Sequence, residues 1–500
     1  EIGYPRSFTI YDTDDSQRVM KAVYKDLNVD EKLIKIKKTA NQIGRWKDKL
    51  ISPEQAVSLS AANYEEQKIA QIYVAYQKQL REAGAFDFDD LIYCTVQLLA
   101  EHPEVREFYQ SKYRYLLVDE YQDTSVAQFK LVSLLTGPEQ NICVVGDDDQ
   151  SIYSFRGATV ENILQFEKIY PKTKTIRLEQ NYRSTSNILN AANCVIQHNT
   201  ERKGKTLWTD NGEGNKVQVY VAESEQDEAA HIAEIIGKHI KEGGHLSDHA
   251  VLYRTNASSA PSQMYFTRAG ISHEIVGGTR FNDRKEIKDI LSYLKTVSNG
   301  KDDLAVQRII NVPKRGIGAT TINRVQEYAN TEDMSFYDAL RVAGTIPGVG
   351  KSVAKLDSFV QMIQTMRSKQ PYYSVKELIE DVLEQTEYRK ELMAEGTEEA
   401  LDRLANIDEL LNKAASYAEH ADNPSLGGFL EEVALVADID NLEEDADHVV
   451  MMTLHSAKGL EFPVVFMVGM EDGMFPSYMS ISSEDSADLE EERRLCYVGI

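Results

Sequence analysis

An aliphatic run that ends in two adjacent carboxylates constrains this chain most: Tyr115-Leu116-Leu117-Val118 followed by Asp119-Glu120. The run is typical of a buried strand, and a parallel sheet brings the last residues of its strands to the rim where ligands bind. There one carboxylate can hold Mg²⁺ while its neighbour orients an attacking water, so the pair suits nucleotide hydrolysis. Taken alone, the pair could equally be two solvated acids, because acidic dipeptides are common on surfaces.

Three further segments change that balance. Residues 146–157 follow a second aliphatic run, Ile142 to Val145, and combine polar groups suited to phosphate with aromatic side chains suited to bases. Residues 178–184 repeat the combination of an aromatic side chain and an arginine, and residues 453–462 contain a histidine and a Lys-Gly turn. The four segments together favour nucleotide hydrolysis over two solvated acids.

In order and spacing, these segments resemble the motifs of the UvrD/PcrA/Rep family, which are DNA helicases of superfamily 1. Four separate motifs spread over nearly the whole chain are far more specific than one short pattern. The resemblance implies an α/β fold with two RecA-like parallel-sheet cores, each carrying an inserted helical subdomain. It also implies a DNA helicase with DNA-dependent ATPase activity, with ATP and Mg²⁺ as cofactors.

Length and composition set wider limits. A chain of 500 residues, 42% of them apolar, is too long for one core and should divide into about three or four domains. No apolar run approaches the roughly 20 residues needed to span a bilayer, and no signal-peptide pattern opens the chain. We therefore expect a soluble intracellular protein without a membrane partner, and the resemblance implies the bacterial cytoplasm and its nucleoid. The four cysteines, which lack zinc-type or disulfide spacing, are expected to be reduced core residues: Cys94, Cys143, Cys194 and Cys496.

The net charge of −25 argues at first against a nucleic-acid partner, because phosphate binding depends largely on Lys and Arg. However, the acids are concentrated in runs such as 441–447 and 482–492, which can be solvated loops. Basic patches remain at residues 35–38 and 313–315. The local field, rather than the net charge, decides whether a groove binds DNA.

The hydrophobic pattern divides the chain into helical and α/β sections. Residues 15–82 are mostly helical in pattern, and the section up to about residue 177 alternates short strands with helices. Strands are predicted at 217–221, 250–253, 273–276 (closed by Gly277-Gly278), 449–454 and 463–468, with a helix through 229–240 and a helical section at 285–440. The helical section therefore interrupts the second α/β unit. The resemblance implies a helical subdomain (1–84), the rest of the first core (85–177), the first part of the second core (178–284), its inserted helical subdomain (285–446) and its second part (447–500).

The resemblance assigns the ATP chemistry to individual residues. Asp119 is the expected Mg²⁺ ligand, Glu120 orients or deprotonates the water, and Gln150 bonds both a γ-phosphate oxygen and the water. Arg183 has the reach and permanent charge of an arginine finger, although a salt bridge at a helix start is the alternative. The remaining cofactor-binding residues implied by the resemblance are Tyr182, Glu461 and Lys458. Tyr182 would stack on adenine, although an aromatic residue beside a strand is more often part of the core. Glu461 would contact the ribose.

A second set of residues is expected to bind single-stranded DNA. Tyr153 and Phe155 offer aromatic faces that accept any base, and Arg156 can pair with a backbone phosphate. His455 resembles a DNA-side or coupling residue of the family, although a lone His beside a strand is more often structural. The family usually has Trp where this chain has Phe155 and a small residue where it has Asp148. The sequence offers no account of Asp148.

Residues 310–318 form the expected contact with duplex DNA. Gly316 and Gly318 would let backbone N–H groups approach a phosphate, and Lys314 and Arg315 would add charge. A plain glycine-rich turn between helices is the alternative.

Residues 344–352 end like a phosphate-binding loop but do not satisfy its pattern. The required first glycine falls on Thr345, and the segment follows a helical pattern rather than a strand. We assign it no nucleotide role; it resembles a second helix-hairpin-helix turn.

No G-x-x-x-x-G-K-[ST] pattern occurs in these 500 residues, and the last ten residues end inside the sixth family motif. We therefore expect an internal portion of a longer helicase that, by itself, binds Mg-ATP poorly and hydrolyses it little.

The function predicted is ATP-dependent movement on single-stranded DNA, with the 3′ to 5′ polarity that the family implies, and unwinding in DNA repair or replication. Expected partners are single-stranded DNA and single-strand/duplex junctions, together with repair or transcription proteins. The alternative is a catalytically degenerate, helicase-like module that binds DNA or protein. A motor with a nuclease domain downstream is a third possibility.

Overall fold

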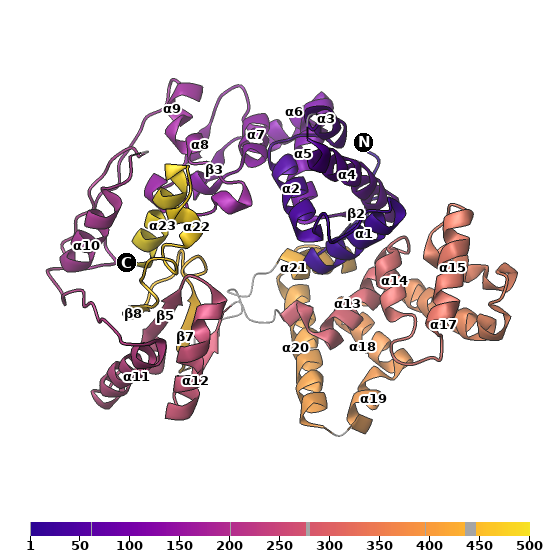
Figure 1. Cartoon of the computed structure of the whole chain (residues 1–500). Helices are drawn as coiled ribbons and strands as arrows, with labels where there is room; N and C mark the ends of the chain where they lie inside the picture. Colours follow the sequence, from indigo (N-terminus) through magenta and orange to yellow (C-terminus); the bar gives the residue numbers. More distant parts are fainter. Residues whose placement is uncertain (1, 62, 201, 277–280, 396, 436–446) are drawn as a thin grey trace. The chain divides into compact units, whose positions relative to one another are not determined.

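The structure is a computed structural model that describes residues 2–500 apart from 62, 201, 277–280, 396 and 436–446. The chain forms two compact units. Unit 1 contains residues 1–105 and 279–436, and unit 2 contains residues 106–278 and 437–500. Figure 1 labels many of the helices and strands of both. Each unit therefore combines segments that are far apart in the sequence.

The first part of unit 1 is helical, as its sequence pattern predicts. Its helices are α1 (Thr13–Asp26), α2 (Ile36–Asp48), α3 (Pro53–Leu59), α4 (Tyr64–Ala83) and α5 (Phe88–Glu101). Two short strands, β1 (Thr9–Ile10) and β2 (Ala85–Phe86), pair in parallel between them. One apolar core holds the helices together, and Trp46 of α2 stacks on Tyr73 of α4 within it.

The second part of unit 1 is also helical. It runs through α13 (Lys285–Ser298), α14 (Asp303–Ile309), α15 (Ala319–Thr331), α16 (Phe336–Arg341), α17 (Val353–Lys369), α18 (Val375–Thr386), α19 (Tyr388–Glu395), α20 (Glu398–His420) and α21 (Leu426–Leu435). Helix α13 is buried on most of its surface and packs against α14, α17, α18, α20 and α21. Even the polar residues Glu286 and Asp289 of this helix are buried, so α13 lies at the centre of the core.

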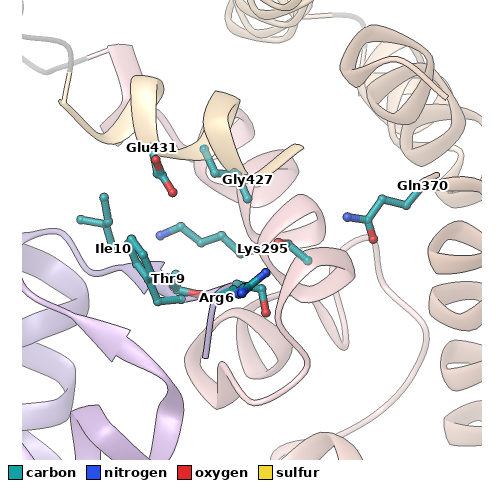
Figure 2. Close-up of a pocket in the computed structure, with 11 residues that line it drawn as sticks. Arg6, Thr9, Ile10, Lys295, Gln370, Gly427 and Glu431 are labelled. Carbon is teal, nitrogen blue, oxygen red and sulfur yellow. The ribbon is translucent and has the colours of Figure 1, made fainter. Parts of the chain in front are cut away.

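Unit 1 encloses a cavity of about 240 Å³ between residues 6–10, α13 and α21. Figure 2 shows the side chains of Arg6 and Lys295 in it, with Glu431 opposite. Lys295 Nζ is 3.1 Å from Asp15 Oδ2, so its charge is already paired. Ligand pockets usually exceed about 300 Å³. None of the residues predicted to bind ATP lines this cavity.

Unit 2 begins with α6 (Pro103–Lys112, shared with unit 1 at its start) and a two-stranded parallel sheet of β3 (Leu116–Val118) and β4 (Ile142–Val144). One face packs against α7 (Val126–Leu135), α8 (Glu161–Leu164) and α9 (Phe166–Ile169) through a core that contains Tyr121 and Phe166. The other face carries Leu117, which is 81% exposed, and Cys143, its partner in register. Successive side chains of a strand point to opposite faces of the sheet, so the face that carries Leu117 and Cys143 is exposed to solvent.

A four-stranded parallel sheet forms the second part of unit 2, in the order β6-β7-β5-β8. Its strands are β5 (His249–Tyr253), β6 (His273–Ile275), β7 (Val449–Thr453) and β8 (Val464–Met467). Alternate residues of β5 and β7 enter two different cores, so both faces are covered. Helices α11 (Glu225–Lys241) and α12 (Ala260–Ala269) pack against each other, as do α10 (Ser186–Ile196) and α23 (Ser486–Gly499). Because β5 and β7 pair directly, the helical residues between them interrupt a single sheet.

Two expectations from the sequence are wrong. Residues 217–221 form no strand in the described part of the chain, and Val219 and Val221 are 88% and 87% exposed. Strand propensity reflects packing against neighbours, and this segment has no strand partner among the described residues. The cysteines are not all in the core either, because Cys143 and Cys194 are exposed. Gly277 and Gly278 lie outside the described residues.

The observed architecture is thus mixed α/β with small parallel sheets. Among the described residues, no helix is both long and apolar enough to cross a membrane.

Candidate functional site

The carboxyl ends of β3 and β4 bring the predicted hydrolytic residues to one edge of their sheet. The strands are parallel and in register from Leu116↔Ile142 to Val118↔Val144. Asp119 and Glu120 follow the first strand, and the loop that contains Gln150 follows the second. The two polar segments therefore begin side by side, as the sequence predicts.

The backbone at Glu120 adopts a left-handed conformation, with φ +48° and ψ +40°. Such a conformation is uncommon outside glycine and is found where surrounding contacts enforce it. The carboxylate of Glu120 accepts a 2.5 Å hydrogen bond from the buried side chain of Gln122, which also accepts one of 2.9 Å from the backbone N–H of Asp147. A Cβ on Gly146 would lie 2.5 Å from Gln122 Oε1. Glycine at this position is therefore what allows Gln122 to join the two strand ends.

Lys458 reaches this site from the turn that follows β7. Its Nζ is 3.2 Å from Glu120 Oε2, forms an ion pair with Asp123 and donates to the carbonyl oxygen of Gln150 at 3.0 Å. The same ammonium lies 5.5 Å from the ring centroid of Tyr153. Its side chain is only 7% exposed, so little solvent screens these interactions. Lys458 thus contacts both the hydrolytic carboxylate and an aromatic side chain of the predicted DNA loop.

The oxygen atoms at this edge fit a magnesium ion. Asp119 and Glu120 present carboxylates at the surface, and Asp123 Oδ1 is buried without a hydrogen-bond partner among the described residues. Burial raises the pKa of Asp123, against the lowering effect of Lys458. Mg²⁺ prefers oxygen ligands and is usually held by one or two carboxylates together with phosphate and water. The described residues contain no group of three His, Cys, Asp or Glu side chains that could hold a metal ion by themselves.

Asp147, Asp148 and Asp149 are held by a basic segment that follows α10. Asp149 Oδ1 accepts from Arg202 Nε at 2.8 Å, and Asp148 Oδ2 accepts from the backbone N–H of Lys203 at 2.7 Å. Lys205 pairs with Asp147. The structure thus explains Asp148, which the sequence did not: its carboxylate connects the loop of Gln150 to residues 202–205.

The Gln150 side chain is held beside the same loop. Its Nε2 donates to Asp147 Oδ2 at 2.8 Å. The loop around it is a short 3₁₀ turn, Asp148–Gln150, in which the two carboxylates are buried. Gln150 is thus positioned by its neighbours rather than left free in solvent.

Arg183 and Glu461 form a separate pair. Arg183 Nε donates to Glu461 Oε2 at 2.6 Å, and both side chains are more than half exposed. Tyr182, beside Arg183, is 77% exposed, and its hydroxyl donates to Gln180. Glu461 lies three residues after Lys458, so one turn carries both of these contacts.

The residues predicted to bind single-stranded DNA form one aromatic cluster. Ring centroids are 6.0 Å apart for Tyr153 and Phe155 and 5.2 Å apart for Phe155 and His455, the latter pair meeting edge to face. The guanidinium of Arg156 lies 5.3 Å from the Tyr153 ring and 5.6 Å from the Phe155 ring. Phe155 is 60% exposed and can accept a base on its free surface.

Both the ring and the backbone of His455 contact this aromatic cluster. The Tyr153 hydroxyl donates to the His455 carbonyl oxygen at 2.9 Å. Burial, together with Arg254 and Arg156, lowers the pKa of His455 to about 4. The imidazole is therefore neutral at pH 7 and would act through stacking or hydrogen bonding, not through charge.

Helix α23 supports the loops of both clusters. Glu491 accepts a 3.1 Å hydrogen bond from the backbone N–H of Ser154, between the two aromatic residues, and Arg494 Nε donates to the Ser151 carbonyl oxygen at 2.8 Å. Glu492 pairs with Arg254 at the end of β5. The aromatic loop therefore has a fixed position relative to the four-stranded sheet.

Comparison with known proteins identifies the family. The model for the UvrD/REP helicase N-terminal domain matches residues 1–171, and the model for the UvrD-like helicase C-terminal domain matches residues 176–500. The ATP-dependent DNA helicases PcrA of Staphylococcus epidermidis and of Staphylococcus aureus are each 47% identical over 502 residues, and that of Bacillus subtilis is 48% identical over 506 residues. Each alignment covers 100% of this chain and 68% of the relative. The chain belongs to the UvrD-like helicase family.

The glycine turn of this UvrD-like chain that was predicted to contact duplex DNA belongs to unit 1, whereas the two clusters belong to unit 2. Lys314 is exposed at its surface. Arg315 points inward instead: its guanidinium donates to the carbonyl oxygens of Ile309 at 2.8 Å and Val312 at 3.2 Å. It also stacks on Phe359 at 5.4 Å. Arg315 therefore shapes the turn, and Lys314 is the side chain of the pair that faces outward.

The segment 344–352, which resembles a phosphate-binding loop only at its end, follows helix α16 and not a strand. A phosphate-binding loop follows a strand, so the setting of this segment differs from that of such a loop.

Sequence reasoning missed three contributors to the helicase site. Gln122 and Asp123 belong to the recognised motif, but nothing in the local pattern shows that one bridges two strand ends and the other pairs with Lys458. The Arg202-Lys203-Gly204-Lys205 segment is visible in the sequence as a basic cluster. This basic cluster could have been recognised from the sequence as the binding partner of the three consecutive aspartates, residues 147–149.

Proposed function

We propose that this chain is an ATP-driven motor that moves 3′ to 5′ along single-stranded DNA and opens duplex at single-strand/duplex junctions. Membership of the UvrD-like helicase family supports ATP-dependent DNA helicase activity. One observation carries the proposal further. The turn at 454–461 contributes His455 to the aromatic cluster, Lys458 to the hydrolytic carboxylates and Glu461 to the pair with Arg183.

The domain arrangement we propose is that of two RecA-like cores, each with a helical subdomain. The first core would comprise residues 85–177, with the helical subdomain 1–84. The second would comprise 178–284 and 447–500, with the inserted helical subdomain 285–446. Two separate parallel sheets with polar loops at the carboxyl ends of their strands support this arrangement.

Each residue of the ATP cluster has a task in this proposal. Glu120 accepts the proton of the attacking water, and Gln150 holds that water against the γ-phosphate. Asp119 would hold a bound Mg²⁺, and the ion would neutralise part of the charge of the phosphates. Tyr182, 77% exposed, offers its ring to the adenine base.

Arg183 is suited to act as an arginine finger because its present ion pair is easily exchanged. Both members of the Arg183–Glu461 pair are more than half exposed, and such surface pairs contribute about 1 kcal/mol or less. Binding of a nucleotide would let Arg183 turn to the γ-phosphate while Glu461 accepts from the ribose hydroxyls.

The DNA side uses stacking together with one phosphate contact. Phe155 and Tyr153 accept bases without sequence preference, and Arg156 pairs with the backbone. Because Lys458 contacts Glu120 and lies near Tyr153, a shift of the base-stacking ring would change the surroundings of the hydrolytic carboxylate. This is a direct route by which DNA can alter the rate of hydrolysis.

Replacement of Glu120 tests the proposal. In the full-length helicase, Glu120→Gln should leave ATP binding intact and lower DNA-stimulated ATP turnover by about 100-fold or more, because a general base contributes that much. Turnover is measured by phosphate release, and binding with a fluorescent ATP analogue. Glu139→Gln, at an exposed position between α7 and β4, is the matched control and should retain full turnover. Undiminished hydrolysis by Glu120→Gln would remove Glu120 from the mechanism.

A further inference from the structure

Residues 202–205, between α10 and α11, form a basic strap on the loop that contains Gln150. Arg202 Nε donates to Asp149 Oδ1 at 2.8 Å, and Arg202 Nη2 donates to Asp149 Oδ2 at 2.5 Å. The Asp149 side chain is 2% exposed. A two-point contact between a guanidinium and a carboxylate fixes the orientation of both groups. Arg202 also donates to the carbonyl oxygen of Lys205 at 3.3 Å, so it holds the backbone of Lys205 as well.

Both ends of the strap are anchored to helices. Before it, Thr200 donates through its backbone N–H and its hydroxyl to Glu490 Oε1 of α23, both at 2.8 Å. After it, the backbone N–H and carbonyl oxygen of Leu207 bond to the side-chain amide of Asn193 in α10, at 3.3 and 3.0 Å. Helices α10 and α23 also pack against each other. The strap therefore has a fixed path across the loop.

Lys205 is the residue of the strap whose charge reaches the side chain of Gln150. Its ammonium forms an ion pair with Asp147 Oδ1. The other oxygen of that carboxylate, Oδ2, accepts from Gln150 Nε2 at 2.8 Å. The side chains of Lys205 and Asp147 are 18% and 19% exposed, so solvent screens their ion pair only weakly. One carboxylate thus joins the ammonium to the amide.

The contact with Asp147 uses only part of the hydrogen-bonding capacity of the Gln150 amide. A glutamine amide has two N–H donors and an acceptor oxygen. Because an ionised carboxylate can only accept, Asp147 binds the nitrogen end of the amide and takes one of its two hydrogens. The second N–H can then donate to a phosphate oxygen, and Oε1 can accept from a water. These are the two contacts that the proposed function requires of Gln150.

Lys205 also acts on this site through its charge. Asp147, Asp148 and Asp149 are three consecutive carboxylates in a loop that is proposed to meet a γ-phosphate. Like charges repel, and the repulsion is stronger where little water separates them. Lys205 Nζ lies 3.6 Å from Asp149 Oδ2 in addition to its pair with Asp147. Its ammonium therefore lies between two of the three carboxylates and weakens their repulsion of a phosphate.

We propose that Lys205 is a positioning residue for ATP hydrolysis and that it sets the orientation of the Gln150 amide through Asp147. Without the ammonium, the Asp147 carboxylate is free to turn and is left with its full charge beside the phosphate. The amide then no longer holds the water in line, and a small misplacement of this kind has a large effect on rate. The inference rests on the proposed function, which gives Gln150 its role.

Kinetics of the DNA-stimulated ATPase of the full-length helicase test the proposal. Lys205→Met keeps most of the side-chain volume and removes the charge. It should lower kcat about tenfold or more, while KM for ATP and affinity for single-stranded DNA change less than about twofold. Lys205→Arg keeps the charge and should retain kcat within about threefold. Lys216→Met, at an exposed position in the same connection between α10 and α11, is the matched control and should keep the parent kcat.

Combination with Gln150→Ala shows whether Lys205 acts through the amide. If it does, Lys205→Met should lower kcat little further in the Gln150→Ala background, because the two residues act as one unit. Binding of a fluorescent ATP analogue by each variant reports a folded site. Losses that multiply would overturn the proposal, as would an unchanged kcat in Lys205→Met or a rise in KM larger than the fall in kcat. Failure of the proposed function has a different signature: Gln150→Ala alone would then keep the parent kcat.

Discussion

Lys47 in unit 1 and Lys458 in unit 2 each lie between two carboxylates, and the two sites differ in how completely the carboxylates are enclosed. In unit 1, Lys47 Nζ lies 2.6 Å from Asp87 Oδ2 and 2.8 Å from Asp90 Oδ1. In unit 2, Lys458 pairs with Glu120 and Asp123. The Glu120 side chain is 53% exposed, whereas the side chains of Lys47 and Asp90 are 0% exposed.

The Lys47 cluster is closed by further hydrogen bonds. Asp87 and Asp90 cap the first turn of α5 reciprocally, Tyr76 donates to Asp87 at 3.0 Å, and Gln77 donates to Asp90 at 2.9 Å. Although burial opposes it, the two carboxylates raise the pKa of Lys47 well above its usual value. A buried ion cluster whose charged atoms are all paired fixes the position of α2 against α5.

The Lys458 cluster is left open in the places where a ligand can bind. Glu120 has a left-handed backbone and an exposed carboxylate, and Asp123 keeps one buried oxygen without a partner among the described residues. Strain and unsatisfied polar groups are typical of functional sites, because a closed network has nothing left to bind. A lysine between two carboxylates therefore forms a structural element in one unit and a candidate catalytic element in the other.

The largest effect is expected from removing the charge of the closed cluster. Lys47→Met preserves most of the side-chain volume but leaves two carboxylates buried without a cation, which costs about 3–5 kcal/mol. The protein has two tryptophans, so Trp208→Phe leaves Trp46, beside Lys47 and 6% exposed, as a fluorescence probe of unit 1 during urea unfolding. In that background Lys47→Met should lower the midpoint strongly. Lys49→Ala, an exposed neighbour, should not. Stability of Lys47→Met within about 1 kcal/mol of the parent would show that the cluster is not structural.

A smaller effect is expected from the pH dependence of the same cluster. Burial, aided by Asp87, raises the pKa of Asp90 to about 7 from its ordinary value of 3.8. The folded state then binds a proton that the unfolded state releases, so the stability contributed by Asp90 is present below pH 4 and is lost as the pH rises to about 7. Asp90→Asn removes this dependence. Its stability relative to the parent, followed by Trp46 fluorescence between pH 4.5 and 7.5, should therefore improve with rising pH. A constant difference would contradict the raised pKa.

The sequence predicted the ends of β3 and β4, and therefore that the loops of Glu120 and Gln150 begin at one edge of a sheet, because an aliphatic run followed by acids has few structural solutions. It also placed the helical section between β6 and β7 correctly as an interruption of one sheet. The strand predicted at 217–221 was wrong, since its valines favour a strand only where a partner strand is present.

Contacts between distant residues lay beyond sequence reasoning. Lys47 and Asp87 are 40 residues apart, and no local periodicity connects them. Asp148 and Lys203 are 55 residues apart and meet through a backbone N–H, which has no sequence signature. Arg315 was predicted to face DNA because it is basic and next to glycine, but the structure turns it onto backbone carbonyl oxygens. The roles of the remaining site residues stay predictions.

The coupling of ATP hydrolysis to DNA through Lys458 is the central claim, and one ratio tests it most directly. That ratio is ATP turnover of the full-length helicase at saturating single-stranded DNA divided by turnover without DNA. Lys458→Ala removes the ammonium between Glu120 and Tyr153, so the ratio should fall about tenfold or more, towards 1, while turnover without DNA changes less. Lys241→Ala, exposed on α11, should keep the parent ratio. An unchanged ratio in Lys458→Ala, or an equal loss of turnover with and without DNA, would contradict the account.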